Sequence, residues 1–331
     1  MSRFGTIDIC CGMGGLSYAA KNAGLSILAG IDISKDALST FKQNFPDATI
    51  INGNINDINI VEQNAKIVAS RRFNGQGTII ISGPPCQGFS DAGPRCSEDP
   101  RNEILLAVAK TIAQLRPEAA LVENVPSLSK QKYSTLVSRF HEILHSEGYN
   151  VYCFKLNALD FGVPQNRKRL FYFILPFEIE KQRIQDEIKL FQKNAIIVKD
   201  ILCDLPMPSE RPLKYIDTDD NGPLSNHYSM RHSEKVRKKI AAIHPGKGPL
   251  SYRKLDPLSQ AATLLSGHRA PPVHYEHPRS ITVREALRLQ GFPDDFRVMG
   301  KFANQMGQVT NAVPVPLGRA ALNVLLNILG E

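Results

Sequence analysis

The first 175 residues alternate between short apolar runs and longer stretches that mix apolar with polar positions. The apolar runs are rich in Ile, Val, Leu and Ala, and their length is typical of buried strands. Strands are predicted at residues 6–10, 26–32, 49–51, 79–82, 119–126, 149–156 and 170–175. Helices are predicted between them, at residues 16–23, 34–44, 61–70, 102–115 and 132–146. This alternation predicts an α/β fold built on a doubly wound, mostly parallel sheet.

The regular pattern fades in the second half of the chain. Residues 178–278 hold many prolines, glycine-rich turns and six of the eight histidines, which predicts a small, irregular second domain. A helical pattern returns at 283–290, where Thr282 and Glu285 have the spacing of a capping box, and again at 316–329. We predict two domains: residues 1–177 completed by residues 305–331, and residues 178–304, which include the helix at 279–293.

The composition, with 42% hydrophobic and 22% charged residues, is that of an ordinary soluble globular protein. No apolar run has the length of a membrane span, and the first strand is predicted close to Met1, so we expect neither an anchor nor a leader. The six cysteines show no C-x-x-C pair and no zinc spacing. We therefore expect reduced thiols, no metal site and a cytoplasmic protein.

The net charge of +8 is concentrated in one segment. Residues 228–280 contain ten Lys or Arg against three Asp or Glu. Such a segment fits a nucleic-acid surface, and on charge alone it fits a solvated basic face equally well. The basic run at 235–239 is open to the same two interpretations.

Cys86 follows the strand at 79–82 and a Gly-Pro-Pro turn that can continue neither a strand nor a helix. A free cysteine is most often a small core residue. However, open α/β sheets bind ligands at the carboxyl ends of their strands, and a loop bounded by Gly and Pro favours exposure. The same edge is predicted to receive one carboxylate and two guanidinium groups, from Glu123, Arg167 and Arg169. Together these groups favour a nucleophilic cysteine.

A glycine turn, Gly12-Met13-Gly14-Gly15, separates the first predicted strand from the first helix. In this layout backbone amides and a helix N-terminus face a ligand. Asp32 ends the second strand, twenty residues after Gly12, where a carboxylate can accept hydrogen bonds from both ribose hydroxyls. The pattern indicates a cofactor that contains adenosine, and it does not separate a nicotinamide dinucleotide from S-adenosylmethionine.

Eight sequence blocks, in this order, resemble those of the DNA cytosine-5 methyltransferases of the single-chain prokaryotic restriction-modification type. They lie at residues 8–15, 30–33, 53–55, 83–90, 123–125, 165–169, 279–293 and 308–316. Each block alone is weak evidence for this family, whereas all eight blocks in this order are specific evidence for it. Only residues 178–278 are left unmatched. The resemblance implies a Rossmann-like S-adenosylmethionine-dependent methyltransferase sheet with helices on both faces, plus a small irregular target-recognition domain.

The resemblance also implies a reaction. A methyl group would pass from S-adenosylmethionine to C5 of a flipped-out cytosine in a specific duplex DNA sequence. Cys86 would add to C6, which is covalent catalysis, and Glu123 would act as an acid at N3. A guanidinium would hold O2, a role that matches Arg167 or Arg169 without a choice between them.

The implied cofactor residues come from the glycine turn, the next two strands and the C-terminal part of the chain. They are Cys10, Gly12, Met13, Gly14, Gly15, Leu16, Asp32, Ile33, Asn54, Ile55, Ile104, Asn311 and Val313. Three positions depart from the family pattern: Cys10 replaces an aromatic residue, Asn54 an Asp and Thr310 a Gly. These departures concern cofactor affinity more than the type of reaction.

The implied partner is double-stranded DNA. The expected DNA contacts are Gln87, Ser90 and Arg95 in a lid at 87–101, and Thr263 and Arg269 in the recognition domain. We further expect a nucleoid-associated monomer, with any cognate restriction endonuclease acting separately. The alternatives are an RNA cytosine-5 methyltransferase of the same fold, or a catalytically silent relative that binds nucleic acid.

Overall fold

The computed structural model describes residues 3–85, 103–211, 224–249, 252–265 and 271–330. Contacts group the chain into two compact units. Unit 1 comprises Met1–Asn157, Lys168–Gln192 and Leu317–Glu331, and unit 2 comprises Ala158–Arg167 and Lys193–Pro316.

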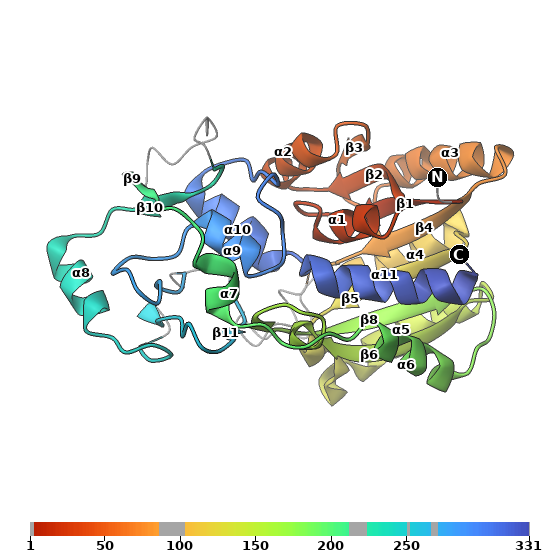
Figure 1. Ribbon diagram of the computed structural model, residues 1–331. Helices are drawn as coiled ribbons and strands as arrows, with labels where there is room; N and C mark the ends of the chain where they lie inside the picture. Colours follow the sequence, from red (N-terminus) through yellow and green to blue (C-terminus); the bar gives the residue numbers. More distant parts are fainter. Residues whose placement is uncertain (1–2, 86–102, 212–223, 250–251, 266–270, 331) are drawn as a thin grey trace. The chain divides into compact units, whose positions relative to one another are not determined.

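Unit 1 is built on a seven-stranded sheet with the order β3-β2-β1-β4-β5-β8-β6 (Figure 1). Its strands are β1 (Phe4–Ile9), β2 (Ser26–Asp32), β3 (Thr49–Asn52), β4 (Gly77–Ser82), β5 (Ala119–Asn124), β6 (Asn150–Asn157) and β8 (Lys168–Leu175). The first five strands pair in parallel, and β8 pairs antiparallel with both β5 and β6. The predicted mostly parallel α/β sheet is therefore confirmed.

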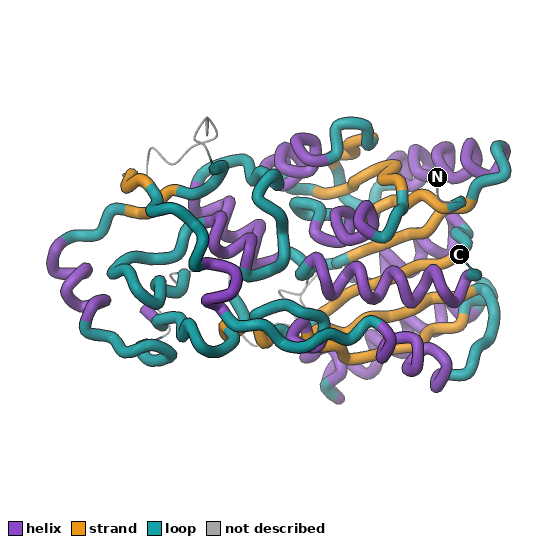
Figure 2. Tube along the Cα trace, viewed as in Figure 1, coloured by secondary structure: helices purple, strands orange, loops and turns teal. Residues whose placement is uncertain are grey.

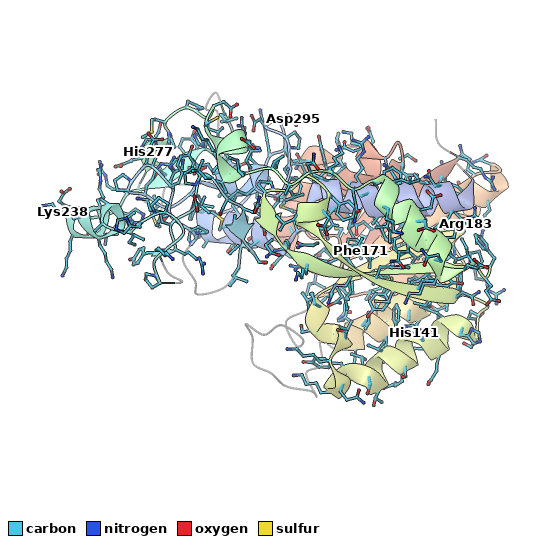
Figure 3. All side chains as sticks on the ribbon, turned by 60° about the horizontal axis from the view of Figure 1, so that its bottom comes forward. His141, Phe171, Arg183, Lys238, His277 and Asp295 are labelled. Carbon is cyan, nitrogen blue, oxygen red and sulfur yellow. The ribbon has the colours of Figure 1, made fainter. Side chains whose placement is uncertain are left out.

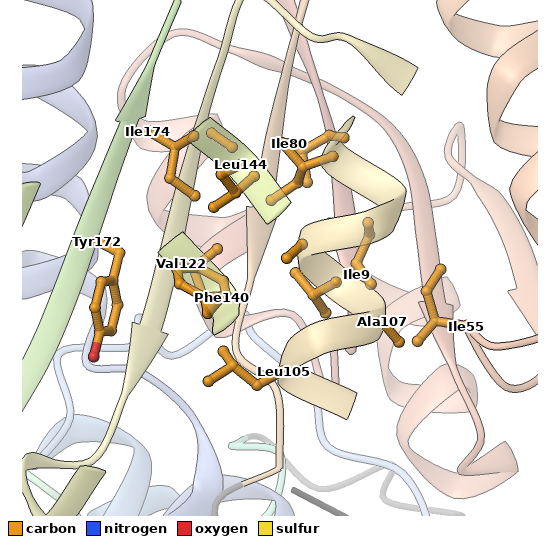
Figure 4. Close-up of a cluster of buried hydrophobic side chains, with 14 of the residues drawn as sticks. Ile9, Ile55, Ile80, Leu105, Ala107, Val122, Phe140, Leu144, Tyr172 and Ile174 are labelled. Carbon is orange, nitrogen blue, oxygen red and sulfur yellow. The ribbon is translucent and has the colours of Figure 1, made fainter. Parts of the chain in front are cut away.

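Helices cover both faces of this sheet, as Figure 1 shows for α11 in front and α4 behind. The helices of unit 1 are α1 (Gly15–Asn22), α2 (Lys35–Asn44), α3 (Ile58–Phe73), α4 (Glu103–Leu115), α5 (Ser134–His145), α6 (Lys181–Leu190) and α11 (Val315–Leu329), with short 3-10 turns at Pro126–Ser129 and Gln131–Tyr133. The core on one face joins alternate strand residues such as Ile9 and Val122 to Leu105 of α4 and Phe140 of α5 (Figure 4). This burial of β-branched and aliphatic side chains is what holds the sheet and fixes its edges.

Unit 2 consists mostly of loops, as Figure 2 shows around α8 and α10. Its helices are α7 (Val198–Leu202), α8 (Glu234–Ala241), α9 (Val283–Arg288) and α10 (Phe302–Asn311), with a 3-10 turn at Ala158–Asp160. Two small parallel pairs join β9 (Ser209–Arg211) to β10 (Tyr228–Met230) and β11 (Ala261–Ala262) to β7 (Gln165–Asn166).

Buried polar side chains take the place of regular structure in unit 2. Arg284 is fully buried and donates to the carbonyls of Ser225, Pro293 and Phe296. The predicted capping box is present: the Thr282 hydroxyl accepts from the Glu285 amide, and the Glu285 carboxylate accepts from the Thr282 amide. Each of these bonds satisfies a main-chain group that would otherwise be buried without a partner.

The predicted elements and the observed ones differ mainly at their ends. The helix predicted at 61–70 extends over Ile58–Phe73, because Asp57 accepts from the Asn59 amide and caps its start. The contact-based units also place residues 158–167 and 305–316 with unit 2, and residues 178–192 with unit 1.

One stretch, Phe302–Leu329, has the length and apolarity of a membrane span. It is interrupted after α10, and 72% of its most apolar window is buried inside the protein. A helix buried in the core of a globular protein can have the same length and apolarity, so these two properties alone do not indicate a membrane span.

Candidate active site

The carboxyl ends of β1, β4 and β5 lie side by side in unit 1. Ile9 is in register with Ser82, and Ser82 with Val122. The Ser82 hydroxyl donates to the Ile9 carbonyl at 2.6 Å and ties these ends together. The residues that follow each strand are therefore presented at one edge of the sheet, as expected for a ligand site in an open α/β fold.

Glu123 and Arg169 form an ion pair at this edge. Arg169 Nε lies 2.8 Å from Glu123 Oε1, and the two side chains are only 12% and 10% exposed. Glu123 Oε2 lies 3.6 Å from the point where a Cβ on Gly83 would stand. The carboxylate therefore borders the turn that leads to Cys86.

The turn itself is tethered from β5. Asn124 Nδ2 donates to the Pro84 carbonyl at 3.5 Å, and Asn124 Oδ1 accepts from the Val125 amide. Asn124 is 1% exposed, and sequence reasoning quoted it only as part of a block. The nucleophile candidate Cys86 and the expected DNA contacts Gln87, Ser90, Arg95 and Arg269 lie outside the described residues.

Arg167 has a different environment from Arg169. It belongs to unit 2, is 1% exposed, and donates to three main-chain carbonyls. Nη1 bonds to Leu264 at 3.3 Å, and Nη2 bonds to Thr310 at 2.8 Å and Ala312 at 3.0 Å. The two arginines that the sequence could not separate thus have separate partners.

The glycine turn is held by Asp32. The Gly12 amide donates to Asp32 Oδ2 at 2.9 Å, and the Ser34 amide donates to Oδ1 at 2.8 Å. Gly12 has a φ of 54°, and a Cβ built there would meet nothing within 4 Å, so this side of the turn is open. Gly14 has a φ of 95°, and a Cβ there would stand 2.5 Å from the Phe45 ring, which explains why only glycine fits.

Asp8 lies behind the glycine turn, and sequence reasoning did not single it out as a site residue. Its Oδ2 accepts from the Ser17 hydroxyl at 2.6 Å, while Oδ1 is buried and has no hydrogen bond from the described residues. Burial raises the pKa of Asp8 to about 7. A buried acidic oxygen without a donor is a place for a hydrogen-bond donor from a ligand or a water molecule.

The neighbouring cysteines are poor nucleophiles. Burial, together with the nearby carboxylates of Asp32 and Asp8, raises the pKa of Cys10 above its usual range, and burial does the same for Cys11. Both thiols therefore stay protonated at neutral pH. Neither is therefore a candidate nucleophile.

The other expected cofactor residues divide by exposure. Ile33 is 72% exposed and Asn54 is exposed, with Asn54 Oδ1 accepting from the Asn56 amide at 3.0 Å. Cys10 and Ile104 are half-buried. Met13, Leu16 and Ile55 are buried. Gly15 starts α1.

The remaining expected residues belong to unit 2. Asn311 is exposed and Val313 is buried. The Thr263 hydroxyl donates to the Asn166 carbonyl at 2.6 Å, so it already has a main-chain partner. The hydroxyl of Thr310, which replaces a glycine of the family pattern, donates to the Gly307 carbonyl at 3.1 Å.

These features fit an S-adenosyl group better than a metal ion. The open glycine turn, the Asp32 carboxylate and the exposed apolar Ile33 provide a backbone cradle, a hydroxyl acceptor and an apolar surface. Within the described residues, no group of three or more His, Cys, Asp or Glu is placed to hold a metal ion.

The comparisons with known proteins agree on one family. The family model described as C-5 cytosine-specific DNA methylase matches residues 4–327. The chain is 30% identical to the Type II methyltransferase M.XorII of Xanthomonas oryzae pv. oryzae, over 97% of this chain and 84% of that protein. It is 28% identical to the Type II methyltransferase M1.HphI of Haemophilus parahaemolyticus, over 97% of this chain and 86% of that protein.

Solved structures give the same result. A prophage-encoded E. coli protein assigned as a DNA modification methyltransferase has a TM-score of 0.80 at 28% identity, covering 99% of this chain and 100% of that one. The S. pombe Dnmt2 methyltransferase shares the fold, with a TM-score of 0.66 at 18% identity and coverage of 98% and 99%. Since the family model and these relatives span nearly the whole chain, the protein belongs to the C-5 cytosine-specific DNA methylase family and is a DNA (cytosine-5-)-methyltransferase.

Proposed function

We propose that this methyltransferase acts on a flipped-out cytosine in duplex DNA, through a covalent bond between Cys86 Sγ and C6, with S-adenosylmethionine as methyl donor. The observation that carries the proposal is the Glu123–Arg169 pair, which borders the turn leading to Cys86. A thiolate, an acid and a guanidinium at one edge are the groups that this chemistry needs.

The Cys86 thiolate adds to C6 and forms a carbon–sulfur bond, because C5 of cytosine is by itself a poor nucleophile. The electron pair of the C5–C6 double bond shifts through C5 and C4 toward N3, where Glu123 supplies a proton. C5 would then take the methyl group, whose bond to the sulfonium sulfur would break to leave a neutral thioether. Loss of the C5 proton to solvent restores the double bond, expels Cys86 as thiolate and returns the N3 proton.

Arg169 has two tasks in this scheme. Its guanidinium holds the Glu123 carboxylate in place at 2.8 Å. Its Nη1 donates to the Lys168 carbonyl at 2.7 Å, and its Nη2 would bond O2 of the base and favour the Cys86 thiolate electrostatically. Arg167 is not assigned this role, because its Nη1 and Nη2 already donate to buried carbonyls.

S-adenosylmethionine, when bound, supplies an electrophilic methyl group. The main chain of Gly12 and Gly14 would approach its methionine part, Asp32 would accept from the ribose, and Ile33 would pack on the adenine. The open side of Gly12 and the exposed Ile33 support this assignment. The buried Asp8 Oδ1 would accept, directly or through water, from the ammonium group.

Cys86 cannot reach a base that is stacked inside a duplex, so the target cytosine must swing out, at a cost of a few kcal/mol of unstacking. We assign target recognition to unit 2 and the lid to residues 87–101, with Gln87, Ser90, Arg95, Thr263 and Arg269 as expected contacts. We also predict that the protein is a monomer located with the nucleoid in the cytoplasm. Any cognate restriction endonuclease is predicted to act separately.

The test is mechanism-based trapping. The target sequence is first found by mapping methylated cytosines in DNA from cells that express the chain. A duplex with 5-fluorocytosine at that position should then form a permanent protein–DNA conjugate with S-adenosylmethionine present, because C5 carries no removable proton. Peptide mapping should place the bond at Cys86.

The control separates the nucleophile from other thiols. Cys86→Ser should bind the duplex and form no conjugate, whereas Cys153→Ser, on the edge strand β6, should form it at the wild-type level. A chain that methylates DNA fully with Cys86→Ser would refute the covalent mechanism.

A further inference from the structure

We propose that helix α8 and the loop after it form a phosphate-binding surface that holds the DNA backbone beside the recognised sequence, without reading bases. This inference rests on duplex DNA being the substrate. We call the surface the α8 basic face. Its members are Arg231, Lys235, Arg237, Lys238, Lys239, Lys247 and Arg253, all exposed.

Negative charge is scarce within this segment. Between residues 231 and 253 the sequence has a single acidic residue, Glu234. It lies 3.8 Å from Lys238, and both side chains are more than 70% exposed, so water screens the pair. Glu210 is shared by Arg231 at 3.9 Å and Arg237 at 3.7 Å. One loosely placed carboxylate cannot neutralise two guanidinium groups.

The fold of α8 directs its lysines outward. Ser233 caps the helix by accepting from the Val236 amide, and Val236 and Ile240, four residues apart, are its half-buried and buried positions. Because positions three and four residues apart share a helix face, Lys235, Lys238 and Lys239 form a single row beside this apolar stripe. Figure 3 shows Lys238 pointing away from the protein.

The loop after α8 extends the row. Lys239 Nζ lies 5.1 Å from the centre of the Tyr252 ring, which joins the end of the helix to the loop. Two backbone bonds hold the chain at Lys247: the Lys254 amide donates to the Lys247 carbonyl, and the Gly246 amide donates to the Lys254 carbonyl. Gly248 has a φ of 103°, and a Cβ there would stand 2.7 Å from the Tyr252 carbonyl oxygen. The cation is therefore presented on a tight, defined turn.

The side-chain chemistry favours phosphates over base edges. Lysine is a flexible point charge, while the planar groups of Arg, Asn and Gln match the paired donors and acceptors of base edges. Lys235, Lys238 and Lys239 are all point charges, and the two arginines of the face nearest to them in the chain, Arg231 and Arg237, both lie against Glu210. Within unit 2, α8 also lies apart from β11, as Figure 1 shows, and Thr263 directly follows β11 in the chain. The α8 basic face thus fits DNA that flanks the recognised bases.

The first test measures salt dependence. In the triple variant Lys235→Gln, Lys238→Gln, Lys239→Gln, the helix is retained because Gln is a good helix former. The plot of log Kd for duplex DNA against log salt should become less steep by about 2 to 3, since each phosphate contact contributes about 0.9. The methylated sequence and the rate at saturating DNA should not change.

The matched control removes the same charge elsewhere. Lys181→Gln, Arg183→Gln, Lys189→Gln on α6 changes the net charge equally at exposed positions of unit 1. This variant should keep the wild-type slope within about 0.5. An unchanged slope in the α8 variant, an equal change in the α6 control, or an altered target sequence in the α8 variant would each overturn the inference.

A second measurement uses the wild-type protein alone. Acetylation of lysines, followed by mass spectrometry, should slow at least several-fold at Lys235, Lys238 and Lys239 when a long duplex is added, but not at Lys181 and Lys189. If the α8 lysines are labelled equally with and without DNA, in a preparation that methylates the duplex, this inference is refuted and the proposed function is not. A wild-type chain that neither binds nor methylates duplex DNA would refute the proposed function as well.

Discussion

Two arginines only two positions apart take separate places in this protein. Arg169 enters β8 and pairs with Glu123 at the edge of the sheet. Arg167 lies before β8, where its guanidinium is surrounded by the carbonyls of Leu264, Thr310 and Ala312. The Arg169 arrangement leaves N–H donors for a substrate. The planar guanidinium of Arg167 instead joins loops that are distant in the chain.

This contrast leads to a prediction for two conservative variants. Arg169→Lys should lower the single-turnover methylation rate by about 100-fold, because a lysine cannot hold Glu123 and bond the base at once. Its thermal unfolding midpoint should stay near the wild-type value. Arg167→Lys should instead lower the midpoint by several degrees, because buried carbonyls lose their donors.

Rapid-quench assays and thermal unfolding of the same preparations provide the measurements. The reverse pattern, with a stable and slow Arg167→Lys and an unstable but fast Arg169→Lys, would exchange the two roles.

At the level of elements, the start of α9 shows how an irregular unit is held together. Although burial raises the pKa of Glu285, two hydrogen bonds from Arg279 lower it below the ordinary value overall. His274 lies against the same carboxylate, with Nε2 3.8 Å from Glu285 Oε1. Its Nδ1 accepts from the amides of Glu276 and His277, so this nitrogen has no room for a proton.

The His274 environment predicts a pH dependence of stability. Burial lowers the pKa of His274 to about 4 from 6.5, so between these values the unfolded chain binds more protons than the folded one. The free energy of unfolding should therefore fall as the pH drops, by about 2 kcal/mol from this group between pH 7 and pH 5.

The control variant is His274→Asn, because its side-chain oxygen can accept from the same two amides and does not titrate. Urea unfolding at pH 7 and pH 5 should show a smaller loss of stability for this variant. Equal losses in both proteins would show that His274 is not the group responsible.

At the scale of the whole molecule, the chain passes from unit 1 to unit 2 at residue 158, returns at 168, leaves again at 193 and returns at 317. The long excursion contains the α8 basic face and most of the segment that the family pattern leaves unmatched. Such an excursion can vary without disturbing the seven-stranded sheet, because the sheet core is made by residues of unit 1.

This organisation predicts that target choice can be transferred. Residues 193–278 of this chain, placed in a family member with a different target, should carry this chain's target sequence with them. The graft should keep Ala261 and Ala262, whose pairing with Gln165 and Asn166 anchors the segment. Methylation mapping of cells that express the chimaera provides the result, and a chimaera with the recipient's target would contradict the assignment of recognition to unit 2.

The pattern of apolar positions was sufficient to predict the strands of the sheet and most of its helices. Runs such as Ile79–Ile81 can only be buried, and a parallel α/β sheet buries its strands on both faces. The same pattern predicted no regular elements in residues 178–278, because short loops held by buried Arg and His side chains have no hydrophobic periodicity. The antiparallel placement of β8 and β6 depends on pairing, which periodicity does not encode.

The sequence by itself determined the family, the reaction type and the order of elements, because these depend on residue types at fixed local spacing. It also put Glu123 at a strand end, where its carboxylate meets Arg169. Only the tertiary structure separated Arg167 from Arg169, found Asp8 behind the glycine turn and showed the lysines of α8 as one exposed row. The physical reason is that burial and hydrogen-bond partners come from residues far away in the chain, up to 145 positions for Arg167.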